Sequence, residues 1–79
     1  MEEIHVGQIY KHFKEKYYIV LTDVAIHTET GERFVVYKRL DKANSVVYVR
    51  PYEMFTSDVD PEKYPQYAGR KRFQLVGSV

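Results

Sequence analysis

The chain has 79 residues, no cysteine, and a formal charge of +1 from 12 Lys and Arg against 11 Asp and Glu. This length predicts a single domain over residues 1–79 with a thin core. The missing thiols exclude disulfides, thiol catalysis and Cys-based zinc sites, and the near-neutral charge argues against strong non-specific nucleic-acid binding.

No apolar run approaches the roughly 18 residues that span a membrane. The first residues, Met1-Glu2-Glu3, are acidic, whereas a secretory signal is basic and then apolar. We therefore expect a cytoplasmic protein without a membrane contact. Eight Tyr and four Phe accompany the absence of Trp, and Tyr is favoured both in strands and at interfaces.

Two strands are predicted in the first third of the chain. The first covers residues 7–13, and a polar turn leads to the longest candidate, residues 17–26. Both faces of this second segment are largely apolar, which is typical of a central strand in a strongly curved sheet. Thr22 and Asp23 interrupt the apolar run and predict a bend or a bulge.

A hairpin connection is predicted over residues 27–32, where Gly31 supplies the positive φ that closes the loop. The returning strand covers residues 33–40. After a polar turn at residues 41–45, the next strand covers residues 45–50.

Pro51 ends that strand, because proline has no main-chain amide to donate and forces the preceding residue into an extended conformation. A single helical turn is predicted near residues 51–56, where Met54 and Phe55 plug one open end of the fold. A polar excursion over residues 56–69 precedes a last strand at residues 72–76.

These elements predict an all-β protein of five to six short strands with one helical turn. An SH3-like barrel fits best, since it commonly closes with such a turn before its final strand, and an OB-type barrel is the alternative. Closure of the barrel would also remove exposed strand edges.

Several spaced motifs carry a family resemblance. They are Tyr18-x-Val20-Leu21, Ala25-x-His27-Thr28-Glu29-Thr30, Val35-Val36-Tyr37 and Val49-Arg50-Pro51-x-Glu53-Met54-Phe55. With them the chain resembles the short bacterial proteins of domain of unknown function 1653, which carry a His-Ser-Glu-Thr loop and a Val-Arg-Pro-x-Glu-Met-Phe step. The resemblance implies an SH3-type barrel in a bacterial, cytoplasmic protein, and it implies no reaction. Thr28 stands where the family usually has Ser.

His27 and Glu29 are two residues apart, so in extended geometry their side chains face the same way. A divalent metal would need further ligands, and no others stand at a characteristic spacing. The favoured interpretation is that both side chains bond to the loop backbone and shape the hairpin. We predict neither a metal site nor a cofactor.

Arg50 and Glu53 flank the junction between strand and helical turn. In a functional interpretation, Glu53 orients Arg50 as an anion hook that opens onto a cleft beside Tyr37 and Tyr48. In a structural interpretation, which we favour, Arg50 pairs with Glu53 or reaches Glu29. A broader aromatic surface is also possible, formed by five tyrosines: Tyr10, Tyr17, Tyr37, Tyr48 and Tyr52.

The leading functional hypothesis is a non-catalytic module that binds a protein or peptide through Tyr37, Tyr48 and Arg50. Weak nucleic-acid binding through the basic run Arg70, Lys71 and Arg72 is the first alternative. The second alternative is a small-ligand domain or an enzyme built on four residues, His27, Glu29, Arg50 and Glu53. Neither a phosphate-binding glycine loop nor a nucleophile elbow is present in the sequence.

Overall fold

The computed structural model describes residues 4–42, 44 and 46–79, and in them six strands form one sheet of antiparallel pairs. The strands are β1 (Gln8–His12), β2 (Tyr17–Val20), β3 (Ala25–Ile26), β4 (Arg33–Arg39), β5 (Val47–Pro51) and β6 (Phe73–Ser78). A four-residue helix, α1 (Tyr52–Phe55), and a 3₁₀ turn, η1 (Pro65–Tyr67), lie between the last two strands. The prediction of a mostly β protein with one short helix is therefore confirmed.

The predicted long strand over residues 17–26 is divided into β2 and β3. A bend at Thr22 and Asp23 separates them, as the sequence predicted. Both pieces pair with the same edge of β4, because the main-chain N–H of Leu21 continues the ladder by donating to the carbonyl of Val36 at 2.9 Å. Gly31 has a φ of +76° in the hairpin that joins β3 to β4, which confirms its predicted role.

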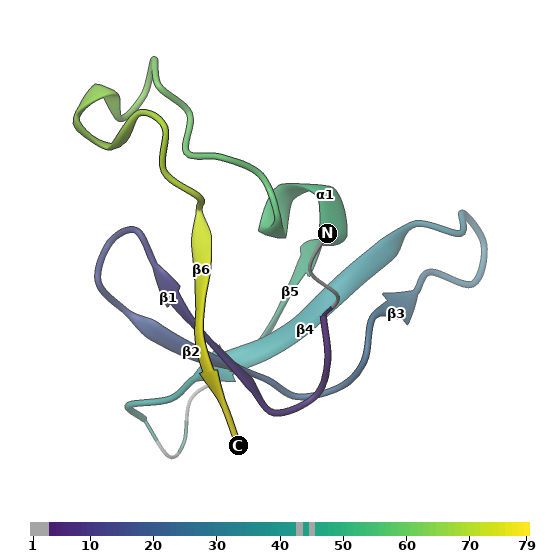
Figure 1. Ribbon diagram of the computed structural model, residues 1–79. Coiled ribbons are helices and arrows are strands. Elements are labelled where there is room, and N and C mark those ends of the chain that lie inside the picture. The colour runs from purple at the N-terminus through teal and green to yellow at the C-terminus, as the bar shows by residue number, and fades with distance from the viewer. Residues whose placement is uncertain (1–3, 43, 45) are drawn as a thin grey trace.

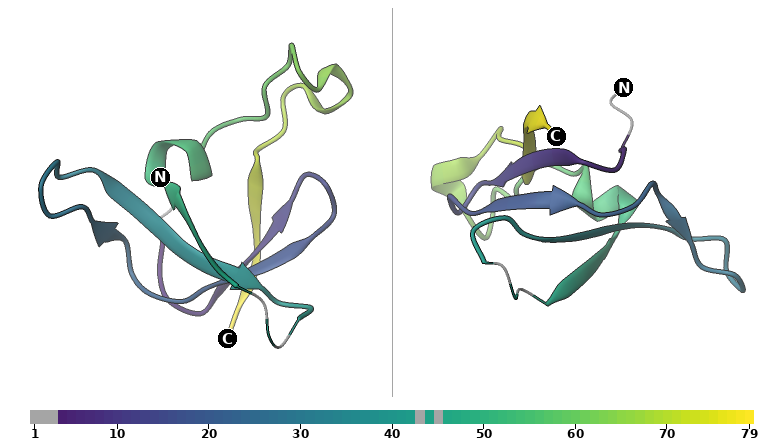
Figure 2. Two further views of the ribbon diagram at one scale, coloured as in Figure 1. Left: turned by 180° about the vertical axis from the view of Figure 1, so that it is seen from behind. Right: turned by 90° about the horizontal axis from the view of Figure 1, so that it is seen from below.

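The sheet is open along one side. Its order is β6, β1, β2, β4 and β5, with β3 in line with β2. Among the described residues no ladder joins the two outer strands, β5 and β6, so closure into a barrel is not confirmed. Figure 1 shows the strongly twisted strands with α1 above their crossing point, and the views in Figure 2 show the β3–β4 hairpin and the 56–72 excursion projecting away from them.

Helix α1 covers the open side of the sheet with Phe55. The side chain of Phe55 is 1% exposed, and its ring stacks on that of Phe73 from β6 with centroids 4.1 Å apart and planes 7° apart. The neighbouring Met54 is 47% exposed, so the prediction that it plugs the core is wrong. Successive residues of a helix point about 100° apart, so a single turn buries only one of the two.

One hydrophobic cluster forms the core on the concave face of the sheet. Aromatic rings dominate it, and Tyr10 meets Phe55 edge-on at a centroid distance of 5.1 Å. The buried members of the cluster are Ile4, Tyr10, Val20, Val35, Tyr37, Phe55 and Phe73.

Replacement of Phe55 by alanine should remove about 3–5 kcal/mol from the free energy of unfolding, because it leaves a cavity and deletes the ring stack. A domain of this size has a total of roughly 4–12 kcal/mol, so urea denaturation should show a marginally folded protein. The matched control, Met54→Ala, should change the value by about 0.5 kcal/mol or less. Equal losses for the two variants would contradict this description of α1.

Candidate binding face

The sequence-predicted residues Tyr48 and Arg50 lie on the core-facing side of β5. In the ladder Tyr48 is opposite Tyr37, and Arg50 is opposite Val35. Both partners on β4 are buried, and opposite residues in an antiparallel pair share a face of the sheet. Since β5 is an outer strand of the sheet, its inward side chains remain partly accessible at this end of the core.

Arg50 is half-buried and held by aromatic groups. Its Nε donates a hydrogen bond to the hydroxyl of Tyr37 at 3.2 Å, and its guanidinium carbon lies 5.6 Å from the ring centroid of Phe73. No carboxylate of the described residues lies within ion-pair distance of it. The terminal nitrogens of a fixed guanidinium are therefore available for a planar anionic group.

Tyr37 and Phe73 contact this arginine, and Tyr18 and Tyr48 pack against Tyr37. These four rings are called the aromatic frame. Within the frame Tyr18 meets Tyr37 at a centroid distance of 5.3 Å and Phe73 at 5.7 Å, both near perpendicular. Burial, reinforced by the nearby Tyr37, raises the pKa of Tyr18.

The aromatic frame is only partly exposed. Tyr48 is 39% exposed and offers its ring to solvent, whereas Tyr37 is 4% exposed and acts through its hydroxyl. Tyr10 is 2% exposed and belongs to the core. A broad surface of five exposed tyrosines is therefore not formed, because alternation along β1 and β4 turns Tyr10 and Tyr37 inward.

His12 adjoins the aromatic frame and was missed in the sequence analysis. Its ring lies 4.9 Å from that of Phe73. Burial lowers the pKa of His12 from 6.5 to about 4, and the positive charges of Arg50, Lys14 and Arg72 act in the same direction. The neutral Nδ1 accepts the main-chain N–H of Lys14 at 3.1 Å. Its position two residues after the buried Tyr10 is the sequence signal that places it on the inner face.

His27 and Glu29 lie in the β3–β4 hairpin. The Nδ1 of His27 accepts the main-chain N–H groups of Glu29 at 3.2 Å and Thr30 at 3.3 Å. This geometry agrees with the interpretation that His27 shapes the loop, while the Glu29 side chain is exposed.

Glu53 is paired with a different arginine from the one expected. Its carboxylate accepts from Arg33 at 3.0 Å, and the guanidinium of Arg33 lies 4.1 Å from the centroid of the Tyr52 ring. Arg33 also holds the pKa of Glu53 below its ordinary value. The structure thus does not form the predicted ion pair of Arg50 with Glu53 or Glu29.

The basic run lies in the segment that leads into β6. Lys71 is 3.5 Å from a carboxylate oxygen of Asp58, and Arg72 donates through Nε to the Ser57 hydroxyl at 3.2 Å. Arg70 lies over the ring of Tyr67 at 5.6 Å. These residues line or adjoin a surface beside β1 that differs from the aromatic frame.

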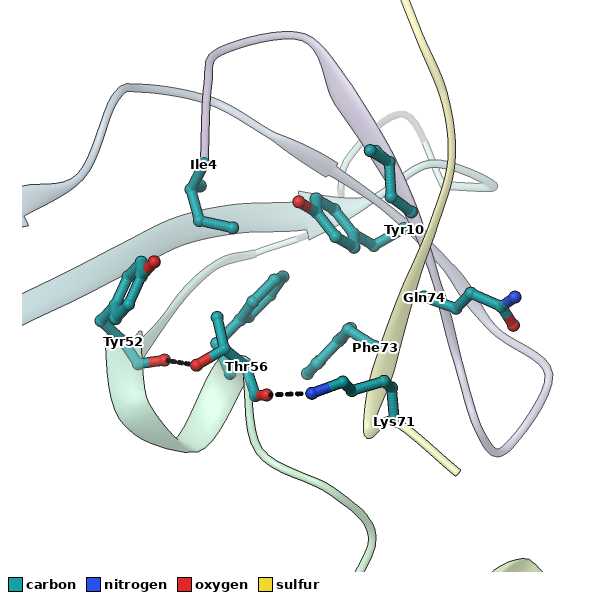
Figure 3. Close-up of a pocket in the computed structure, with 9 residues that line it drawn as sticks. Ile4, Tyr10, Tyr52, Thr56, Lys71, Phe73 and Gln74 are labelled. Atoms are coloured by element: carbon teal, nitrogen blue, oxygen red, sulfur yellow. Dashed lines mark hydrogen bonds between the residues drawn. The ribbon is translucent and has the colours of Figure 1, made fainter. Parts of the chain in front are cut away.

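A pocket of about 530 Å³ opens between α1, β6 and the segment that precedes β1 (Figure 3). Core rings form its floor, and Figure 3 shows Lys71 at one side, donating to the carbonyl of Thr56 at 3.4 Å. The lining residues are Ile4, Tyr10, Tyr52, Phe55, Thr56, Lys71, Phe73, Gln74 and Leu75. This lining suits an apolar group, and the pocket is separate from the partly exposed Tyr48 and Arg50.

In the part of the chain that the structure describes, no three His, Asp or Glu side chains are close enough to hold a metal ion. Neither of the two helices described there is long and apolar enough to cross a membrane.

The comparison with known families matches residues 8–75 to the family described as Protein of unknown function (DUF1653). The chain belongs to this family. The match runs from the first residue of β1 into β6 and includes the whole aromatic frame and Arg50. No curated protein and no solved structure matches the chain. Membership of DUF1653 confirms the predicted family and assigns no activity.

Acidification should weaken the fold through His12. Above pH 6.5 both folded and unfolded His12 are neutral, whereas between pH 6.5 and about 4 only the unfolded chain takes up the proton. Stability should therefore fall as pH falls through this window, by about 1–2 kcal/mol for a partly exposed group.

Urea denaturation at a series of pH values should show a smaller loss for His12→Gln, which keeps a side chain able to accept the Lys14 amide. An NMR titration of His12 should give a midpoint near 4, and Arg50→Gln should raise it. A midpoint near the ordinary value of about 6.5 would contradict the burial of this ring.

Proposed function

We propose that this DUF1653 protein is a non-catalytic binding module that recognises a carboxylate of a partner protein or peptide at Arg50. The proposal rests on how the Arg50 side chain is held in place. A half-buried guanidinium is oriented by the Tyr37 hydroxyl and the Phe73 ring, without a carboxylate partner among the described residues. An arginine held in this way has already lost most of the conformational freedom that binding would cost.

The exposed side chains of β5 favour a protein partner over a small ligand. Val47 and Val49 are 61% and 62% exposed and lie on the opposite face of this outer strand from Tyr48 and Arg50, so side chains on both faces of β5 are accessible. A partner chain that follows the free edge of β5 would contact Arg50 and Tyr48 on one face and the two valines on the other, and Arg and Tyr are enriched at protein interfaces. A carboxylate at Arg50 would supply orientation, and Tyr48 and the valines would supply contact area.

An SH3-like architecture is the second part of the proposal. The strand order and the short helix before the last strand support it, since a small barrel of this kind has the same succession of elements. In this arrangement the Phe55–Phe73 stack takes the place of a ladder between the outer strands. The binding face then lies at one end of the barrel, where aromatic side chains of such modules hold peptides.

We propose binding without catalysis because two residues of the enzyme alternative make other contacts. His27 is bonded to its own loop, and Glu53 is paired with Arg33. Neither is positioned with Arg50 around a reacting group.

Selection of a displayed library of random peptides against the wild-type protein should enrich peptides with Asp, Glu or a free C-terminus at a constant position. Their affinity for Arg50→Gln should fall about 30-fold or more, since truncation of one partner of a buried charge pair is costly. Tyr37→Phe should cost a smaller factor of about 2–10, because it removes only the hydrogen bond that orients the guanidinium.

Lys42→Gln is the matched control, since Lys42 is an exposed cation in the turn that follows β4. Its peptide affinity should equal that of the wild type. Selected peptides that bind Arg50→Gln as tightly as the wild type would overturn the proposal, provided that the variant shows a wild-type NMR spectrum outside the aromatic frame.

A further inference from the structure

A second surface, formed by the end of β1 and the excursion before β6, combines cations with aromatic rings. Phe13, at the end of β1, meets the rings of Tyr64 and Tyr67 at centroid distances of 5.0 and 5.2 Å, both tilted by more than 60°. The two tyrosines belong to the excursion between α1 and β6 and are half-buried. Three rings from two distant segments therefore form one cluster at the protein surface.

Cations lie over these rings. Lys14 Nζ is 4.9 Å from the centroid of Tyr64, Lys63 Nζ is 5.7 Å from the same ring, and the guanidinium of Arg70 is 5.6 Å from that of Tyr67. The ammonium of Lys14, hydrogen-bonded to the hydroxyl, lowers the pKa of Tyr64, which shows how closely the charge approaches. We call Lys14, Lys63, Tyr64, Tyr67 and Arg70 the basic aromatic patch.

The charge of this patch is not balanced locally. Lys11 is neutralised by Glu15 at 2.7 Å, and Lys71 is 3.5 Å from Asp58. For Lys14, Lys63 and Arg70, however, no carboxylate of residues 4–42, 44 and 46–79 lies within ion-pair distance.

The acidic residues nearest to Lys63 in the sequence lie at the tip of the excursion, and they form no ion pair with the described residues. They are Asp60 and Glu62, and the carboxylate of Asp60 accepts the main-chain N–H of Glu62 at 2.9 Å. A protein whose total charge is +1 thus carries a concentrated positive surface at one place.

A pocket lies beside the basic aromatic patch. It has a volume of about 580 Å³ and lies between β1 and the segment that leads into β6. Lys11, Arg70 and Lys71 line it, with Glu15 as the single carboxylate among its lining residues, and Phe13 belongs to both pocket and ring cluster. Exchange of the Glu15 and Asp58 ion pairs for an external anion would be inexpensive, since exposed pairs contribute only about 0–1 kcal/mol.

We propose that the basic aromatic patch binds single-stranded nucleic acid, with phosphates at Lys14, Lys63 and Arg70 and bases stacked on Tyr64 and Tyr67. Cations alone would suit any polyanion, and the interleaved rings are what favour unpaired bases. This site is independent of the carboxylate site at Arg50, so either can fail without the other.

A fluorescent oligothymidylate of about 15 nucleotides is a suitable probe, since it can follow both pocket and patch. Its affinity should fall with salt, and log K against log salt should have a slope of about −2 for three phosphates, at about −0.7 for each. Arg70→Ala should reduce the magnitude of this slope by about 0.7. Lys42→Ala, which removes an exposed cation after β4, should leave affinity and slope unchanged.

The substitution Tyr67→Leu tests the contribution of base stacking separately from that of charge. It should weaken oligothymidylate binding about 5-fold or more without changing the salt slope, whereas Tyr67→Phe should retain wild-type affinity. Tyr67 lies in η1, outside the buried core cluster, so both variants should keep the wild-type NMR spectrum of the sheet.

Two results would overturn the proposal. The first is no measurable binding of the oligothymidylate at low salt. The second is heparin or duplex DNA competing as well as the single strand while Tyr67→Leu has no effect, which would identify a general polyanion surface.

Discussion

The stack of Phe55 on Phe73 is the contact on which this fold depends most. In the described residues no hydrogen-bonded ladder joins β5 to β6, so side chains must hold the two outer strands of the sheet together. The two rings are nearly parallel and belong to the segments on either side of the gap. A helix of four residues has no stability of its own. Helix α1 is therefore present because Phe55 is anchored in the core, and the anchor in turn positions the chain that leaves toward the excursion.

The ring of Phe73 also connects the core to the proposed binding face. Phe73 contacts Phe55 on one side and lies within 6 Å of Tyr18, Tyr37 and the guanidinium of Arg50. A binding face that shares a ring with the core is as rigid as the core itself. Folding has therefore already fixed the conformation of the Arg50 side chain, so binding loses little further conformational entropy there. A single charged contact contributes most to affinity under this condition. Tyr48, on the same face, remains 39% exposed and can adapt to the shape of a partner.

The sequence predicted the features that depend on neighbouring residues. The Arg50-Pro51 step placed the end of β5 and the start of α1, and Gly31 marked its hairpin, because proline and glycine restrict the local backbone in known ways. Which arginine pairs with Glu53 depends on the register between strands that are far apart in the sequence, so the sequence did not predict this ion pair. Glu53 is close to Arg50 in sequence, yet the ladder that sets Pro51 opposite Phe34 brings the start of β4 to α1, and Arg33 takes the carboxylate.

Tyr64 and Tyr67 of the 56–72 excursion pack against Phe13, which is about 50 residues away in the sequence, and no local pattern records that packing. Met54 illustrates the same limit within one turn. Its neighbour Phe55 is equally apolar in the sequence, and only the direction in which α1 meets the sheet decides which of the two is buried.

The distribution of charge gives a reason for the two separate surfaces. Lys11, Arg33, Arg39 and Lys71 each lie near a carboxylate on the surface, and such exposed pairs contribute little to stability. Arg50, Lys14 and Arg72 have no such partner among the described residues, and after burial their charges are the next causes that lower the pKa of His12.

Burial and these positive charges lower the pKa of His12, and an anion bound beside Arg50 or Lys14 would oppose the effect of the charges. The pKa of His12 would then rise, so that mild acid would strengthen anion binding while it weakens the unliganded fold.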